Sequence, residues 1–233
     1  MKLIDNINTR LGDDLKESIG KGSRLSIAAS SFSIYAYEAL RKELEKIEEL
    51  RFIFSSPTFV EEKFTKEVPT FYIPHIIREA DLCGGDFELQ LKNKLNQRAI
   101  AKECSKWVKA KVKFKSNRYH HLPINGLIHV QNNAQSEYAY SNINSFTTSD
   151  LGISQRKSFP TLIQKTEFPD SHAFLEWFNE IWENEEDLQE VTQKVQEYFE
   201  SAYKENSPEF IYFITLYNIF NEFLEDISLE SLP

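Results

Sequence analysis

Two apolar runs on either side of an amphipathic pattern constrain the fold of this chain more than any other feature. The run "RLSIAASSF" at 24–32 matches a strand buried on both faces, and "LRFIFSS" at 50–56 matches a second one. Between them, apolar residues recur at helical spacing over 33–48, and Ser33 is a suitable N-cap. A strand, a helix and a strand within about 30 residues form a βαβ unit. The pattern therefore predicts parallel strands joined by a right-handed crossover.

The rest of the chain predicts further strands first and helices later. Pro57, Pro69, Pro74 and the Gly84-Gly85 pair predict no long element over 56–90. We expect helices over about 6–19 and 91–110, strands over 111–117, 126–131 and 136–141, and helices around 174–182, 188–202 and 207–224. The predicted fold class is α/β, with a mixed β-sheet flanked by helices over 1–160 and the strand at 126–131 near its middle. An acidic α-helical region is expected over 161–233.

Composition limits the classes of protein to which the chain can belong. Apolar residues make up 41% of it and aromatic residues 13%, which is typical of a globular protein. No segment approaches the roughly 20 apolar residues that a membrane-spanning helix needs, so we expect no membrane contact and a cytoplasmic location. Cys83 and Cys104 have no neighbouring Cys or His, so two reduced core thiols are expected rather than a zinc site or a disulfide.

The charges divide along the chain, although the net charge is −9. Between Lys92 and Arg118 ten basic residues are opposed by Glu103 alone, whereas seventeen carboxylates from Glu167 onward face two lysines. The basic segment predicts either nucleic-acid contact or a solvated face that neutralises the acidic helices. The candidate nucleic-acid-binding residues are Lys94, Arg98, Lys102, Lys106 and Lys109 on one helical stripe, followed by Lys111, Lys113 and Lys115 on one strand face.

The stretch "PINGLIHVQNNAQSEYAYSNINSFTTSDLG" at 123–152 has the outline of a phosphodiesterase motif. Phospholipase D-type enzymes use His-x-Lys on a strand, followed by Gly-Ser-x-Asn; the His attacks phosphorus, and the Lys and Asn stabilise the phosphoryl oxygens. The chain resembles the phospholipase D-like domain at the N-terminus of bacterial Swi/Snf-type (superfamily II) helicases. The segments that carry this resemblance are "RLSIAASSFSIYAYEALRKEL", "QRAIAKECSKWVKAKVKFKSN", "SFTTSDLG" and "YKENSPEFIYFITLYNIFNEFLEDI".

The chain departs from that motif at the residues that carry the chemistry. With His129 matched to the second His of the family strand "HGKMYHI", Ile124 takes the nucleophile position and Gly126 the lysine position. "SNIN" replaces Gly-Ser-x-Asn and retains Asn144, while none of the five histidines begins a His-x-Lys. His120-His121 lacks an evident third ligand and is expected to lie in a solvated loop, so we expect no metal and no cofactor.

Three functions remain open at this point. The first is a non-catalytic accessory domain of an ATP-dependent helicase, which contacts DNA, forms a homodimer and precedes a motor in the same polypeptide. The sequence contains no Gly-x-x-x-x-Gly-Lys nucleotide motif, so the motor itself is not in this segment. The second is a phosphodiesterase or nuclease with an unorthodox site at His129 and Asn144. The third is a structural protein-interaction module.

Overall fold

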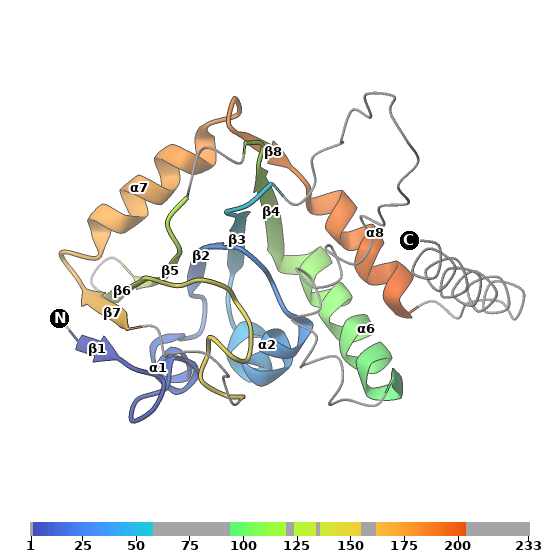
Figure 1. The fold of residues 1–233 in the computed structure, drawn as a ribbon, viewed down its shortest axis with the longest axis horizontal. Helices are drawn as coiled ribbons and strands as arrows, with labels where there is room; N and C mark the ends of the chain where they lie inside the picture. The colour runs from blue at the N-terminus through green and yellow to red at the C-terminus, as the bar shows by residue number, and fades with distance from the viewer. Residues whose placement is uncertain (1, 58–93, 120–123, 134–135, 155–161, 204–233) are drawn as a thin grey trace, which may run out of the picture. The chain divides into compact units, whose positions relative to one another are not determined.

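The centre of the fold is a mixed β-sheet, which in the described part of the chain has eight strands in the order β1-β7-β6-β5-β2-β3-β4-β8 (Figure 1). The structure is a computed structural model that describes residues 2–57, 94–119, 124–133, 136–154 and 162–203. The strands are β1 (Lys2–Ile4), β2 (Arg24–Ala29), β3 (Glu49–Phe54), β4 (Val112–Asn117), β5 (Leu127–Asn133), β6 (Ser136–Ser141), β7 (Ile163–Glu167) and β8 (Leu188–Glu190).

The predicted βαβ unit is present and forms the parallel part of the sheet. β2 pairs with β3 in parallel, with Ile27 opposite Phe52, and β3 pairs with β4 in the same way. β5 lies antiparallel to β2 and is the fourth strand of the order, so the strand at 126–131 lies near the middle as predicted. The predicted fold class, a mixed α/β sheet flanked by helices, is confirmed.

The helix predicted over 33–48 is interrupted near its centre. Ser33 caps its start, because its side chain accepts a hydrogen bond of 3.1 Å from the backbone N–H of Tyr35. Leu40 then leaves helical geometry at φ −111° and ψ 14°, and so two short helices replace one long one. The helices of the described chain are α1 (Leu11–Ser18), α2 (Ile34–Ala39), α3 (Arg41–Leu44), α6 (Lys94–Lys111), α7 (His172–Glu183) and α8 (Thr192–Tyr203).

The helices cover the two faces of the sheet unequally (Figure 1). One face meets α2, α6 and α8 around a cluster in which the ring of Phe32 contacts those of Phe52, Trp107, Phe114 and Phe199. On the same face, α1 contacts β6 and β7 through Asp14. The other face meets α7, which buries Phe178 and Trp182 in a second core cluster with Ala28, Ile53, Leu127, Ala139 and Leu188. Because neighbouring residues of a strand point to opposite faces, β3 contributes to both clusters.

Strands occur where the sequence predicted only helices, and this part of the prediction needs correction. β7 and β8 both follow residue 160 and both belong to the sheet, so the expected boundary at 160 falls between two neighbouring strands, β6 and β7. The compact unit continues to Ala202. β7 reads "IQKTE" and carries a single apolar residue, which is why its sequence does not show a strand. The predicted helix at 207–224 lies outside the described residues.

Candidate functional site

The residues that align with the phosphodiesterase motif meet where β5 begins and β6 ends. Leu127 pairs with Ser141 at this end of the hairpin, and the chain then crosses to the end of β2. There the backbone N–H and the hydroxyl of Ser30 both donate to the carbonyl oxygen of Asn144, at 3.0 and 2.9 Å. The fold therefore places the positions of Ile124, Gly126 and Asn144 at one end of the sheet.

The position of the missing lysine has no room for any side chain. A Cβ atom built on Gly126 would lie 1.5 Å from the carbonyl oxygen of Ile143 and 2.6 Å from its carbonyl carbon. Both atoms belong to the backbone, so neither can swing aside as a flexible side chain could. Glycine at this position is thus required by the close approach of two chain segments.

The nucleophile position differs from the enzyme pattern in a second way. β5 begins only at Leu127, so Ile124 and Gly126 precede the strand and do not share one of its faces. Ile124 is half-buried and packs against the core cluster under α7. A side chain added at Gly126 would instead point at the backbone of Ile143. Two side chains at these positions would diverge, and they could not meet one phosphate.

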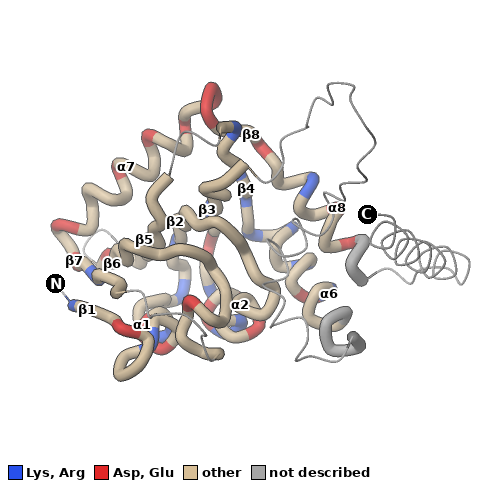
Figure 2. Tube along the Cα trace, in the orientation of Figure 1, with Lys and Arg blue, Asp and Glu red and all other residues tan. Residues whose placement is uncertain are grey.

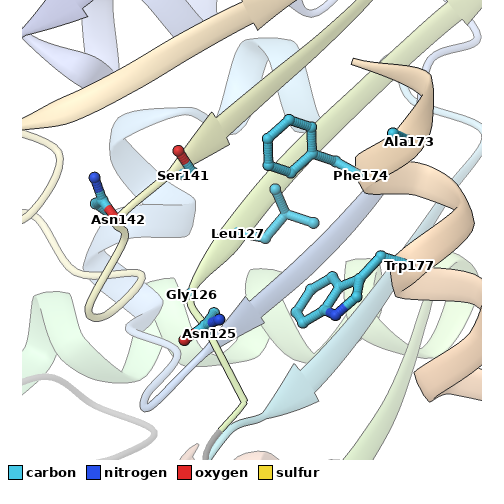
Figure 3. A pocket seen from close by; sticks show the side chains of 8 residues that line it. All are labelled: Asn125, Gly126, Leu127, Ser141, Asn142, Ala173, Phe174 and Trp177. Atoms are coloured by element: carbon cyan, nitrogen blue, oxygen red, sulfur yellow. The ribbon is translucent and has the colours of Figure 1, made fainter. Parts of the chain in front are cut away.

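A pocket of about 550 Å³ lies next to this strand end, between the hairpin and α7 (Figure 3). Phe174 and Trp177 reach into it from α7 and face Leu127, so its inner wall is apolar. Its lining residues are Asn125, Gly126, Leu127, Ser141, Asn142, Ala173, Phe174 and Trp177. No ionisable side chain is among these described residues, which therefore supply neither a proton-transfer group nor a cation for a phosphoryl oxygen.

The loop that follows Asn144 is organised as a structural turn. The backbone N–H of Ser145 donates to the carboxylate of Asp150 at 2.8 Å, and the Ser145 hydroxyl bonds to the same oxygen. The backbone N–H of Phe146 donates to the carbonyl of Ser31 at 2.9 Å, which attaches this loop to the end of β2. The carboxylate of Asp150 is therefore occupied by the turn, in the segment "SFTTSDLG" that the resemblance singled out.

His129 lies elsewhere, in the interior of β5 on the face covered by α7. Its side chain is fully buried, and neither ring nitrogen has a hydrogen-bond partner among the described residues. Nε2 lies 3.6 Å from the carboxylate of Glu137, which is too long for a normal hydrogen bond. Burial lowers the pKa of His129 to about 4, although the Glu137 carboxylate acts in the opposite direction. His129 lines a separate cavity of about 420 Å³, and Asn144 lines neither this cavity nor the pocket at Gly126.

The buried His129 makes stability depend on pH. Because the folded pKa is about 4 and the ordinary value is 6.5, the unfolded chain binds more protons between these values, and stability falls as pH falls through this window. Between pH 7 and about pH 4.5 we expect the free energy of unfolding to drop by about 2 kcal/mol on this account. Urea denaturation at both pH values should show the drop in wild type and not in His129→Leu. Equal drops in the two proteins would contradict this assignment.

Figure 2 marks the Lys and Arg residues along the described chain. Their burial and contacts separate the candidate nucleic-acid-binding residues into an exposed group and an engaged group. Lys102 and Lys106 of α6 are exposed, and the side chains of Lys94 and Arg98, at the start of α6, lie outside the described part. The other four contact the rest of the chain. Lys109 pairs with Glu200 of α8, Lys111 donates to the carbonyls of Glu45 and Ile47 at 2.6 and 2.7 Å, Lys113 pairs with Glu49 at 3.0 Å, and Lys115 donates to the carbonyl of Trp182 at 2.7 Å.

Two of these contacts reach the helices α7 and α8. Lys109 contacts α8, and the Lys115 ammonium also lies 5.1 Å from the ring centroid of Trp182 in α7. Lys111 belongs to the end of α6 rather than to a strand, so it does not share the face of Lys113 and Lys115. The alternation of lysine and apolar residues along β4 predicted that the lysine face is solvated. In the structure α7 packs on this face, where Lys115 contacts Trp182.

Sequence reasoning gave no role to Arg51 or Glu137, which surround His129. Arg51 stands within the apolar run "LRFIFSS", and the only signal was one charge inside a strand predicted to be buried. Glu137 is 2% exposed, accepts from the Gln131 side chain at 3.0 Å and lies 3.2 Å from Nδ1 of His172. Among the residues that the structure describes, no group of three His, Cys, Asp or Glu could hold a metal ion. His120, His121 and Cys83 lie outside those residues, and Cys104 is buried in α6.

The comparisons with known proteins concern the fold. No protein-family model matches the chain, and no curated protein matches its sequence. Among solved structures, the chain is similar to phosphatidylserine synthase of Haemophilus influenzae Rd KW20, with 11% sequence identity and a TM-score of 0.46. The similarity covers 93% of this chain and 42% of that enzyme. This chain thus spans less than half the length of that neighbour. No helix in the described residues is long and apolar enough to cross a membrane.

Proposed function

We propose that this chain is a non-catalytic phospholipase D-like domain that contacts nucleic acid through the exposed side of α6. The observation that carries the first part is the carbonyl of Ile143, which fills the space that a lysine at Gly126 would need. The neighbouring pocket adds support, since the described residues that line it include no ionisable group. Without the nucleophile and the lysine, neither the covalent route nor charge stabilisation at phosphorus is open to this motif.

The nucleic-acid part of the proposal is supported by the charges of α6. Glu103, the only acid in the basic segment, is engaged by Arg41, so it offsets the adjacent lysines only in part. Lys102 and Lys106 are exposed on this helix and lie in the middle of the predicted basic stripe. Exposed lysines on one helix face suit phosphate contacts, which do not depend on base sequence. The contact surface is proposed to be Lys94, Arg98, Lys102 and Lys106, a narrower set than the sequence predicted.

The resemblance to Swi/Snf-type helicases supports the wider context of the proposal. In that context the domain forms a homodimer, precedes a helicase motor in the same polypeptide and acts in the cytoplasm. A structural protein-interaction module is the second candidate, and the contacts of Lys109 with Glu200 and of Lys115 with Trp182 favour it. In that case the basic segment serves the packing of α7 and α8, and nucleic acid has no role.

A charge-reversal experiment distinguishes these two functions. We expect Lys102→Glu with Lys106→Glu to weaken binding to duplex DNA strongly and to lower the log–log salt slope by about 1.8, because each lost phosphate contact removes about 0.9. The melting temperature should hardly change, since exposed charges contribute little to stability. Fluorescence titration of labelled duplex at several salt concentrations measures both the affinity and the slope.

The matched control carries the same change of charge on another part of the surface. Lys16 and Lys21 are exposed at and just beyond the end of α1, which lies on the far side of α2 from α6 (Figure 1). Lys16→Glu with Lys21→Glu should leave the salt slope unchanged. Equal affinities in wild type and the α6 variant, or equal losses in both variants, would refute the α6 surface.

A further inference from the structure

The face of the sheet under α7 contains a polar row beside the apolar core cluster, and this row runs from the exposed Lys113 through the half-buried Arg51 to the buried Ser26 and His129. Strand pairing places Lys113 of β4 next to Arg51 of β3, Arg51 next to Ser26 of β2, and Ser26 next to His129 of β5. All four residues line one cavity of about 420 Å³, whose other wall is α7. Polar groups in the middle of a sheet are costly to bury unless they have partners, so this row needs an explanation.

The cavity lies at the other end of the strands from the degenerate motif. It begins at Arg24 and Ser26, where β2 starts, whereas Ser30 after the end of β2 contacts Asn144. It shares no lining residue with the pocket at Gly126. Its role is therefore independent of the function proposed above.

Arg51 is the central cation of this cavity. Its guanidinium lies 5.1 Å from the ring centroid of Phe178 and 5.6 Å from that of Trp182, which fixes its plane against α7. It donates one hydrogen bond of 3.0 Å to the hydroxyl of Ser26. Of the carboxylates that the structure describes, none forms an ion pair with it within 4.0 Å. A guanidinium has five N–H donors, so this stacked arginine keeps capacity for a bidentate oxyanion.

The remaining charges of the cavity largely neutralise one another. Lys113 pairs with Glu49 at 3.0 Å, and Arg24 at the rim pairs with Glu48 at 2.8 Å. Glu183 is exposed at the end of α7. Glu49 and Glu183 act on the Arg51 guanidinium through space, but among the described carboxylates neither lies within ion-pair distance of it, so the cavity suits one negative charge better than two.

His129 adds a second group without a partner. Both of its ring nitrogens are buried and lack hydrogen bonds to any residue that the structure describes, and it forms part of the cavity wall two strands away from Arg51. Its neutral ring has one donor and one acceptor. Because both nitrogens are closed to solvent, the ion partner of a ligand in this cavity is Arg51 and not His129.

We propose that this cavity binds a small organic molecule through a singly charged oxyanion, with Arg51 as its ion partner and the rings of Phe178 and Trp182 supporting the guanidinium. A carboxylate and a phosphodiester share this chemistry, because each presents two oxygens and one negative charge to the fork of an arginine. The volume leaves space for an organic group beside the oxyanion.

Calorimetric titration of the whole chain tests the proposal. The ligands are sodium benzoate, dimethyl phosphate and sodium sulfate, and each is compared with sodium chloride at equal ionic strength. Saturable binding of benzoate, of dimethyl phosphate or of both is expected, and the stronger of the two identifies the oxyanion. Sulfate, with two charges, should bind more weakly. Binding of sulfate alone, or of no anion, would overturn the proposal.

Variants locate the site. Arg51→Met keeps the stacking volume and should weaken binding at least about tenfold, because it removes the charge and the fork. Arg51→Lys keeps the charge and should bind with intermediate affinity, which provides a second test if the methionine variant folds poorly. Arg10→Met, at an exposed position just before α1 that does not line the cavity, is the control and should bind like wild type. Equal affinity in wild type and both Arg51 variants would contradict the assignment.

Discussion

Replacing Gly126 with lysine should lower the free energy of unfolding by about 4 kcal/mol or more, even though it restores a residue of the phosphodiesterase motif. Any side chain there meets the carbonyl of Ile143, 1.5 Å from the position of Cβ. Relief would require moving the loop after β6, and hydrogen bonds from Ser30 and from Ile143 itself hold that loop. Gly126→Ala should show most of the same loss, because the first carbon already overlaps. Urea denaturation followed by circular dichroism measures the effect.

The neighbouring residue provides the control for this prediction. Asn125 is exposed, so Asn125→Lys introduces the same side chain one position earlier without a clash. It should change the free energy of unfolding by less than about 0.5 kcal/mol. A Gly126→Lys protein as stable as Asn125→Lys would show that the backbone at Ile143 does not close this position. The double change Ile124→His with Gly126→Lys should likewise fail to create a site, because Ile124 is directed into the core under α7.

The second large effect is expected at Asp14, in a buried network between α1 and the sheet. The carboxylate of Asp14 accepts from Lys165 at 2.5 Å and from the hydroxyl of Tyr140 at 2.7 Å, and it also pairs with Lys2. Lys165 is 7% exposed and its ammonium lies 4.4 Å from the ring centroid of Tyr138. Asp14→Ala would leave this buried ammonium without its carboxylate. We expect a loss of about 3–5 kcal/mol, measured by urea denaturation.

The adjacent aspartate is the matched control for this network. Asp13 is exposed and pairs with Lys16 on the surface, so Asp13→Ala should cost less than about 1 kcal/mol. Burial alone would raise the pKa of Asp14, but the hydrogen bonds from Lys165, Lys2 and Tyr140 outweigh it and lower that pKa. The stabilisation is therefore complete above the ordinary value of 3.8 and is lost as pH falls through the folded value. Similar losses in the two alanine variants would contradict the network.

The sequence predicted the parts of the fold whose signals are local. The apolar runs that became β2 and β3 gave the parallel core, and Ser33 gave the start of α2 because capping depends on a few neighbouring residues. β7 could not be predicted in this way. Lys165 within it is buried only because Asp14, far away in the sequence, supplies a carboxylate. A polar strand stabilised by such a partner shows no pattern of its own.

The candidate site was predictable in its residue types and not in its geometry. Alignment to the motif placed Gly126 at the lysine position, but only the fold shows that the carbonyl of Ile143 occupies the space. Alternation along β4 correctly put Lys113 and Lys115 on one face, yet α7 covers that face and accepts from Lys115. Both contacts depend on how segments that are distant in the sequence pack together, and the periodicity of residues within one strand or helix carries no information about this packing.

The most direct test of the central claim is an assay of phosphodiester cleavage by the purified chain. Single-stranded DNA, double-stranded DNA and a chromogenic phosphodiester would each be incubated with wild type, with and without divalent metal, beside His129→Ala and Asn144→Ala. The absence of the nucleophile and the lysine predicts no turnover by wild type above that of the two variants. Cleavage by wild type that disappears in His129→Ala or in Asn144→Ala would contradict the claim that this phospholipase D-like site is non-catalytic.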